Sequence, residues 1–271
     1  MLEIQLRSFP RASEIWFADE AASPSGIPTG DVRFKQAKRR PSDGLEKYSE
    51  VFPFRTLLTD LTADQARLWS AISPATRNYI NAAAAKLAYE VAYFEGNSPA
   101  SFYEFLARFM ARKGLWTPPP AYYEKHLAHG TVACALLDGE IAVLHFYLYD
   151  REAGRAHLLW SARSLRSLTG ADPAYERAVS SLNKLLHWRD LLHFKNEVGI
   201  ATYDWGGIAP GAPALRGVDE FKRQFGGVPV TEWEVAWRSP LYAPLRKLAR
   251  SVPRRQARPP VSTPLTNRRA A

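Results

Sequence analysis

Residue types able to do chemistry gather directly after a short apolar stretch, residues 200–203. A carboxylate, an indole and a pair of glycines follow, and this pattern predicts that a buried strand breaks there and leaves backbone open to a ligand. The carboxylate is placed to accept a proton, and the glycine N–H groups are placed to face an oxyanion. We therefore expect a cleft at this corner, lined by Tyr203, Asp204, Trp205, Gly206 and Gly207.

Each of these candidates also has an ordinary structural interpretation. Asp204 is equally suited to an Asx-turn that stabilises the end of a strand. Lys222, on a short helix expected over residues 218–225, is placed either to bind a phosphate or carbonyl oxygen or to be a plain exposed lysine. His157 alternates with apolar neighbours along a predicted strand, which favours a satisfied histidine of the core over one that lines a cleft.

Other reactive side chains give weaker signals. The single cysteine, Cys134, lies in an apolar run, which indicates a buried side chain and excludes a disulfide framework. His187 and His193 are six residues apart on a predicted helix, so they lie on different faces and cannot form a compact metal pair. No cysteine, histidine or carboxylate cluster has ligand spacing, and no Gly-x-Ser-x-Gly motif is present. The sequence therefore predicts no metal centre and no serine hydrolase.

The elements that must position these residues can be placed from local signals. Asp138-Gly139 between two apolar runs is a strong hairpin signal, Ser73-Pro74 opens a helix, and Asp172 caps a long one. The expected strands cover residues 3–9, 13–18, 52–61, 89–95, 132–137, 141–149, 156–162, 200–203 and 229–237. The expected helices cover residues 63–72 (capped by Thr62), 74–87, 102–113, 122–129, 173–197 and 218–225. From the hairpin onward the expected order is β-β-β-α-β-α-β.

Charge and composition divide the chain into a core and a tail. The formal net charge is +9, and the nine lysines and arginines after residue 237 account for all of it because no acidic residue accompanies them. We expect one domain over residues 1–239, with a mobile loop at 20–47, and a basic tail over 240–271 that starts as a short amphipathic helix and ends disordered. The basic composition of the tail favours a solvated appendage, and attraction to RNA or to an anionic membrane face is the alternative.

The corner and the residues downstream resemble a known family. Asp-Trp-Gly-Gly-Ile at 204–208, followed by Phe-Lys-x-x-Phe-Gly-Gly at 221–227, is similar to motifs of the FemAB/FemX acyltransferases. Thr-Arg-x-x-Ile at 76–80 resembles another pattern of that group. The resemblance implies an α+β, GNAT-like acyltransferase fold, with a mixed central sheet flanked by helices. It also implies transfer of an aminoacyl group to a peptidoglycan precursor.

The same resemblance suggests where substrates bind. In the GNAT fold the acyl donor lies where two parallel strands diverge, here residues 156–162 and 200–203, and its phosphates rest on the loop 163–172. Arg166 would bind the donor there, and Arg77 would hold an acidic group of the acceptor. The glycine of this loop, Gly170, comes one position later than in enzymes that use acyl-CoA, and Asp172 places a carboxylate at the phosphate position. The departure favours aminoacyl-tRNA over acyl-CoA as donor.

The sequence thus predicts an acyltransferase with Asp204 and Lys222 as catalytic residues and no bound cofactor. The acyl donor would be aminoacyl-tRNA or acyl-CoA, and the acceptor a small or lipid-linked amine of the cell envelope; no DNA is expected as a partner. Two alternatives stay open: an acetyl-CoA-dependent N-acetyltransferase, and a non-catalytic relative that binds RNA or membrane through its tail.

No signal peptide and no run of about 18 apolar residues is evident, so we expect a cytoplasmic protein, with peripheral membrane contact through the tail as an option.

Overall fold

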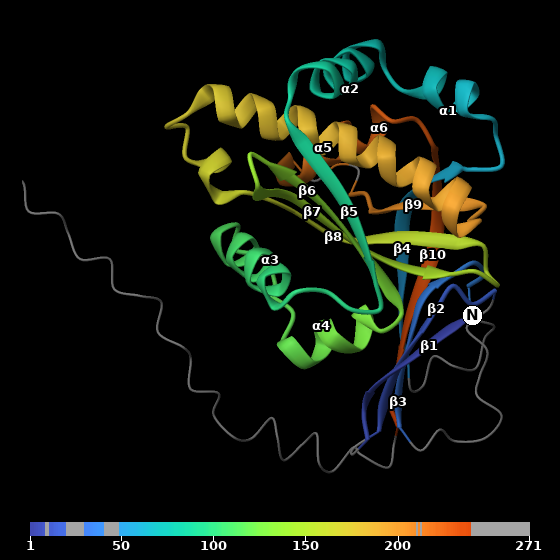
Figure 1. The fold of residues 1–271 in the computed structure, drawn as a ribbon. Helices are drawn as coiled ribbons and strands as arrows, with labels where there is room; N and C mark the ends of the chain where they lie inside the picture. The colour runs from blue at the N-terminus through green and yellow to red at the C-terminus, as the bar shows by residue number, and fades with distance from the viewer. Residues whose placement is uncertain (9–10, 20–29, 41–48, 210, 212, 240–271) are drawn as a thin grey trace, which may run out of the picture.

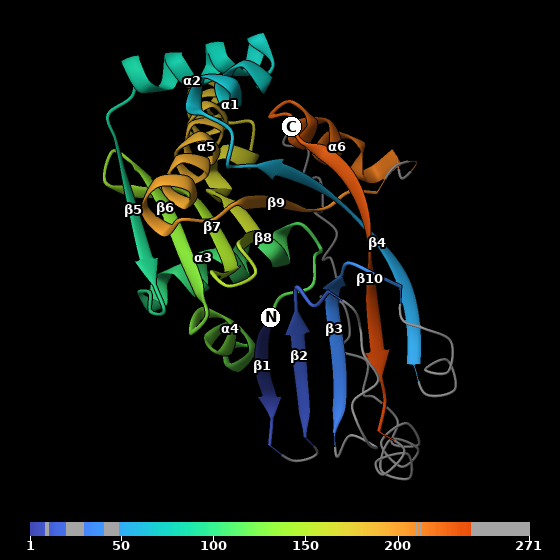
Figure 2. The same ribbon diagram turned by 90° about the vertical axis from the view of Figure 1, so that its right-hand side faces the viewer.

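A computed structural model describes residues 1–8, 11–19, 30–40, 49–209, 211 and 213–239. Within them one ten-stranded mixed sheet runs through the molecule in the order β1-β2-β3-β10-β4-β9-β8-β7-β6-β5 (Figures 1 and 2). The strands are β1 Leu2–Arg7, β2 Ala12–Trp16, β3 Asp31–Ala37, β4 Ser49–Asp60, β5 Tyr89–Glu95, β6 Gly130–Leu137, β7 Glu140–Asp150, β8 Arg155–Arg163, β9 Thr202–Gly207 and β10 Val228–Trp237.

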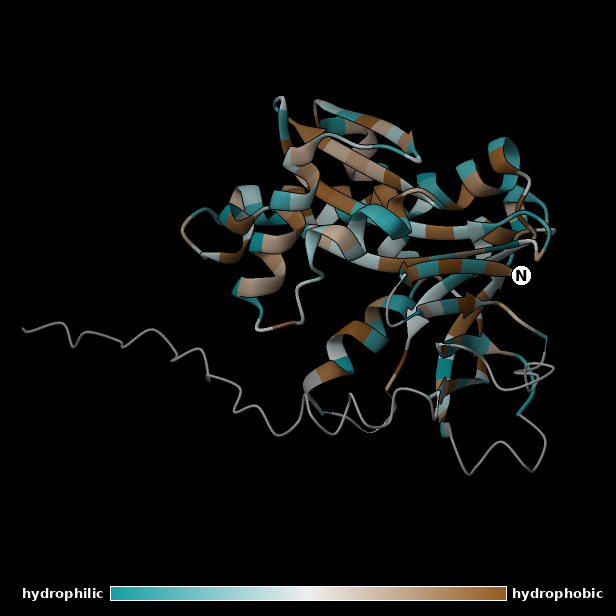
Figure 3. Ribbon diagram, turned by 90° about the horizontal axis from the view of Figure 1, so that it is seen from below, coloured by the Kyte–Doolittle hydropathy of each residue, from teal (hydrophilic) through white to brown (hydrophobic). Residues whose placement is uncertain are grey.

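Helices cover both faces of this sheet. They are α1 Gln65–Ala71, α2 Pro74–Lys86, α3 Ala100–Arg112, α4 Pro120–Leu127, α5 Pro173–His193 and α6 Arg216–Arg223. Figure 1 shows α1, α2, α5 and α6 on one side, and α3 and α4 on the other. Each side has its own apolar cluster, and the central strands between them are largely apolar (brown in Figure 3). None of the helices in the described residues has the length and apolar character needed to cross a membrane.

Local signals account for several of these boundaries. The Ser73 side chain caps α2 and Pro74 occupies its first turn, and the Asp172 carboxylate accepts a hydrogen bond from the backbone of Tyr175 at the start of α5. Asp138 and Gly139 both have positive φ, as a tight hairpin between β6 and β7 requires. The predicted order from the hairpin onward, β6-β7-β8-α5-β9-α6-β10, is confirmed.

Two predicted boundaries were wrong. Asp64, not Thr62, caps α1, because the Thr62 hydroxyl instead donates to Asp60. Helix α5 ends at His193, and a π-helical turn continues the chain to Gly199, whose φ is positive. The long helix is therefore shorter than the predicted 173–197.

The segment 20–47 is not simply a loop. Its residues 31–37 form β3, which pairs in parallel with β2 and antiparallel with β10. Phe34 and Ala37 are buried beside Val235 in a small apolar cluster, and this burial offsets the polar composition that pointed to a loop. Residues 20–29 and 41–48, and the predicted tail at 240–271, lie outside the described residues.

The β6–β7 hairpin leaves no room for a side chain at its open end, and this gives a stability test. A Cβ at Gly130 would lie 2.5 Å from the carbonyl oxygen of Tyr147, whereas one at Gly217 in α6 would meet nothing within 4 Å. Gly130→Ala should lower the free energy of unfolding by about 1–3 kcal/mol through overpacking. Gly217→Ala should be neutral or stabilising, by up to about 1 kcal/mol of helix propensity. Equal urea midpoints for the two variants would contradict this packing.

Candidate active site

The sheet forks between β8 and β9. These parallel strands pair only through Arg155–Thr202, Ala156–Tyr203 and His157–Asp204. Beyond that point β8 carries one additional residue, Leu159, in its pairing with β7, while β9 stays paired with β4 as far as Gly207. A bulge of this kind bends a strand, and the pairing of β8 with β9 ends at Asp204. The predicted fork between diverging parallel strands is thus present.

A buried ionic network holds the base of the fork. The Asp204 carboxylate, fully buried, accepts hydrogen bonds from the Arg155 guanidinium at 2.6 Å and from the Gln36 amide at 2.6 Å. It also contacts Nδ1 of His157 at 2.9 Å and the hydroxyl of Thr56. Five strands meet here, because the same guanidinium donates two hydrogen bonds to Glu232 of β10, at 2.6 and 2.8 Å.

This environment argues against Asp204 as a general base. Burial alone would raise its pKa, but His157, Arg155 and Thr56 together hold the pKa well below its usual range. A carboxylate held so strongly in its ionised form, with no solvent access, is a poor proton acceptor. Its other oxygen accepts the backbone N–H of Gly206 at 2.9 Å, which is the Asx-turn named as the structural alternative. The Asp204 carboxylate therefore holds the corner in place through its hydrogen bonds.

The aromatic residues of the corner are sealed as well. Tyr203 and Trp205 are fully buried, with their polar atoms bonded to Tyr147 and Thr59. The strand also continues through Trp205 to Gly207 instead of breaking at Asp204, because pairing with β4 carries it on. The expected cleft lined by these side chains is therefore wrong. Of the five corner residues only Gly207 is exposed.

Lys222 is the candidate that does reach the fork. A Cβ at Gly206, whose φ is +73°, would lie 2.8 Å from the Leu158 carbonyl oxygen of β8 and 3.7 Å from Nζ of Lys222. The ammonium therefore lies beside the point where the strands separate, and it donates to the Gly207 carbonyl at 2.6 Å. Burial lowers its pKa to about 8, against the opposing attraction of Asp204 and Asp219. A half-buried lysine of this kind can stabilise negative charge or exchange a proton near neutral pH.

The predicted phosphate loop is occupied by its own side chains. Asp172, besides capping α5, accepts from the Arg166 guanidinium at 2.7 Å, and Arg166 also stacks over the Tyr175 ring at 4.1 Å. The Asp172 carboxylate thus already occupies both the N-terminus of α5 and the Arg166 guanidinium, the two groups expected to bind a phosphate. Arg77 lies half-buried on α2 and makes no ion pair with any other described residue. The structure does not bring Arg77 and Arg166 into contact with the fork residues.

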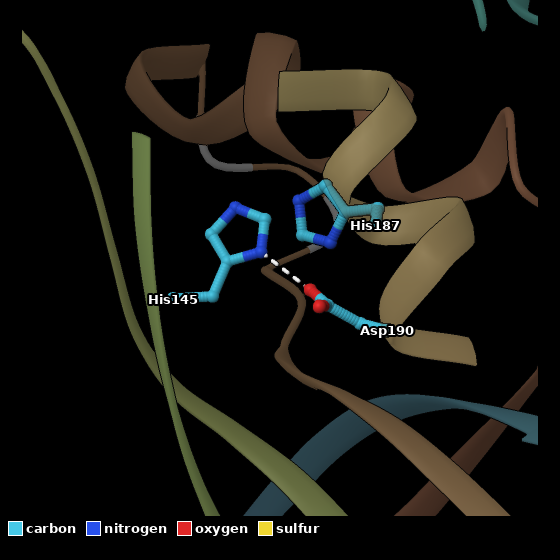
Figure 4. A group of neighbouring side chains, drawn as sticks. All are labelled: His145, His187 and Asp190. Carbon is cyan, nitrogen blue, oxygen red and sulfur yellow. Dashed lines mark hydrogen bonds and ion pairs between the residues drawn. The ribbon is translucent and has the colours of Figure 1, made fainter. Parts of the chain in front are cut away.

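A further polar group, missed by the sequence reasoning, lies on the α5 side of the sheet (Figure 4). Ligand atoms of His145, His187 and Asp190 come within 4.8 Å of one another, and all three residues are buried. His145 contacts Asp190 through Nδ1 at 2.7 Å and Asn183 through Nε2 at 3.0 Å. Because its partner His145 is 42 positions away in β7, no spacing around His187 could reveal this group.

The ring geometry of this group favours a hydrogen-bond network over a cation site. The two imidazoles are stacked, with centroids 4.0 Å apart and planes 26° from parallel. Nitrogen lone pairs lie in the ring plane, so stacked rings do not direct two nitrogens at one ion. Tyr147 adds a hydrogen bond to Asp190 at 2.5 Å and contacts the Tyr203 hydroxyl at 2.7 Å.

With the geometry established, comparison with known proteins identifies the class of fold. No protein-family model matches the chain, and no curated protein matches it. Among solved structures, FemX is 13% identical over 69% of this chain, with a TM-score of 0.54. The C-terminal DUF2156 domain of a putative lysylphosphatidylglycerol synthetase from Agrobacterium fabrum is 15% identical over 77% of this chain, with a TM-score of 0.50.

These similarities are at the level of the fold. The matches cover 63% of the FemX chain, which is less than two thirds of its length, and 68% of the Agrobacterium domain. Together with the element order, they confirm the GNAT-like fold that the sequence predicted. This chain therefore shares its fold with FemX and with the Agrobacterium domain.

The ionic network at the fork gives a second stability test. Arg155→Met should lower the free energy of unfolding by about 3–5 kcal/mol, because it leaves two buried carboxylates without their cation. Arg166→Met removes an arginine from an exposed pair with Asp172 and should lower it by no more than about 1 kcal/mol. Chemical denaturation of both variants measures the difference. If Arg155→Met were as mild as the surface variant, the network would not be what holds the fork.

Proposed function

We propose that the protein is an acyltransferase that moves an aminoacyl or acyl group onto an amine. The observation that carries this proposal is the fork between β8 and β9 with the Lys222 ammonium beside it. Backbone of diverging strands can align an extended acyl donor, and the lysine supplies a positive charge where the attacked carbonyl oxygen gains negative charge. The FemX-like fold supports the same reaction class.

Lys222 takes the role of oxyanion stabiliser in this proposal. When the acceptor amine attacks the donor carbonyl, electrons move to the carbonyl oxygen, and a hydrogen bond from the ammonium stabilises the tetrahedral intermediate. Collapse of the intermediate expels the donor's oxygen or sulfur, which takes up a proton, and the amine nitrogen loses one. Asp204 acts indirectly, because its network fixes the fork and, through Gly206, the backbone beside Lys222.

The proposed substrates rest on the resemblance and on the contacts within the loop 163–172. Since Asp172 and Arg166 neutralise each other in the loop 163–172, we favour aminoacyl-tRNA over acyl-CoA as donor. The proposed acceptor is an amine of a peptidoglycan-type, small or lipid-linked envelope precursor. The proposed place of action is the cytoplasm, including the inner face of the membrane.

Changing Lys222 tests this role. Lys222→Met should lower turnover about 10²–10³-fold, as loss of an oxyanion donor does. Arg223→Met, which removes an exposed cation from the next position of α6, should leave turnover near that of the unaltered protein. The assay would offer a labelled aminoacyl-tRNA pool and, separately, acetyl-CoA, each with a UDP-linked peptidoglycan precursor. Equal turnover of the two variants would remove Lys222 from the mechanism. Transfer from acetyl-CoA and not from aminoacyl-tRNA would show that the donor is an acyl-CoA.

The pH dependence should follow the same residue. If the ammonium is the active form, turnover should fall as the pH rises above about 8, where Lys222 loses its proton. Lys222→Arg should keep part of the activity and lose this alkaline decline, because arginine remains charged. An unchanged decline in the arginine variant would assign the titration to another group. Stability should move the other way: because the folded-state pKa is lowered, the unfolding free energy should rise between pH 8 and the unfolded value near 10.4.

The cationic tail supports a second candidate, a protein that binds RNA or an anionic membrane through its tail without catalysis. Eight arginines and lysines lie in residues 240–271, with no acidic residue among them. Removing these residues distinguishes the two functions. An enzyme should keep turnover of soluble substrates, whereas a tail-dependent binder should lose its only activity.

A further inference from the structure

An exposed tryptophan marks the linker between α3 and α4. The protein has eight tryptophans, all within the described residues, and Trp116 is the only one of them that is largely exposed, at 61%. Its neighbour Leu115 is 51% exposed. Single apolar side chains on a surface are common, but a tryptophan normally buries most of its large ring. A leucine and a tryptophan exposed side by side therefore indicate a surface that meets a partner.

The local fold holds this pair out in solvent. Gly114, with a φ of +65°, ends α3, and the Leu115 N–H donates back to the Met110 carbonyl at 2.9 Å. The Trp116 ring packs edge-on against the Tyr122 ring of α4, with centroids 5.3 Å apart and planes at 87°. The exposure of both side chains thus belongs to an ordered turn with its own hydrogen bond and ring contact.

Cations border the apolar pair. Arg112 is the last residue of α3 and Lys113 follows it; both are exposed, and neither makes an ion pair with another described residue. Arg108, one turn earlier on the same face of the helix, has only a 3.8 Å contact with Glu104. The stretch 107–118 therefore carries three positive charges and no negative one.

This combination of side chains selects the class of partner. Tryptophan is enriched at the level of lipid headgroups, aliphatic side chains bury their area below them, and cations attract anionic headgroups. A single-stranded nucleic acid would use the cations and the ring but leave Leu115 without a contact. A second copy of this chain, docked through the same surface, would place like charges against each other. A bilayer that contains anionic lipids matches all of the exposed groups.

We propose that the end of α3 and the linker 113–117 form a docking surface for an anionic membrane. Leu115 and Trp116 insert at the headgroup level, while Arg112 and Lys113 contact lipid phosphates. This surface belongs to the folded domain and is separate from the basic residues at 240–271. It goes beyond the proposed transfer activity and does not depend on it. Helices α3 and α4 lie on the side of the sheet away from α6 (Figure 1), so docking here would not cover Lys222.

Sedimentation of the full-length protein with vesicles tests the surface. The protein should bind vesicles of phosphatidylcholine and phosphatidylglycerol more tightly than vesicles of phosphatidylcholine alone, and added salt should weaken this binding. Trp116→Ser should weaken it about tenfold, through lost apolar burial. Arg112→Gln combined with Lys113→Gln should weaken it about thirtyfold, since each cation near an anionic surface contributes about 1 kcal/mol.

Matched controls lie on the other side of the sheet. Tyr79→Ser removes an aromatic side chain of similar exposure, 52%, from α2. Lys86→Gln combined with Arg177→Gln removes two exposed cations, from α2 and α5. Both controls keep residues 240–271, so any binding through those residues is the same in every protein compared. Affinity for the anionic vesicles should be unchanged in the controls.

Tryptophan fluorescence reports insertion directly. Lipids brominated on their acyl chains should quench the emission of the unaltered protein, and they should quench Trp116→Phe much less, because the other seven tryptophans stay within the fold. The proposal is overturned if Trp116→Ser binds anionic vesicles as tightly as the unaltered protein, or if brominated lipids quench both proteins equally. It is also overturned if a short single-stranded RNA, and not the vesicles, changes the Trp116 emission. Vesicle binding without any acyl transfer would count against the proposed function and leave this surface in place.

Discussion

The ion pairs of the Arg155 guanidinium with the buried carboxylates of Asp204 and Glu232 hold the middle strands of the sheet together. Three strands contribute these charges, and Gln36 and Thr56 bring in two more. Burying an ion is unfavourable unless each charge is matched and hydrogen-bonded, so the network restricts β8 and β9 to one register. The strands can part only beyond it. The fork is therefore the first position at which the sheet is free to open.

This arrangement explains why an acidic residue in a family-like motif need not be the reactive group. Asp204 stands where a base would be sought, yet its oxygens are taken up by arginine, histidine, amide and backbone donors. The groups left for chemistry at the fork are backbone atoms and Lys222. In the proposed mechanism, catalytic geometry then depends on a residue that touches no substrate.

Features encoded by neighbouring residues could be predicted from the sequence. The Asp138-Gly139 hairpin, the Ser73 and Asp172 caps and the order of elements after the hairpin depend on local conformational preferences, and the structure confirms them. The burial of His157 was also predicted correctly.

What could not be predicted depends on pairing between distant segments. β3 forms in a polar segment because β10 and β2 lie on either side, and β9 extends because β4 pairs with it. Arg155 gave a weak signal as a charge at the start of an apolar strand, but its partner Glu232 is 77 positions away. Lys222 was placed on its helix correctly, whereas its proximity to Gly206 depends on how α6 lies over the fork.

The position of β10 has a consequence for how the chain matures on the ribosome. This strand, near the end of the described sequence, lies between β3 and β4 and pairs with both (Figure 2). Until it has been synthesised, the first three strands have no hydrogen-bonded connection to the rest of the sheet, and the facing edges of β3 and β4 are open. Such late, non-local pairing slows folding and exposes strand edges during translation. A chain released from the ribosome before β10 has been synthesised would therefore hold two incomplete sheets.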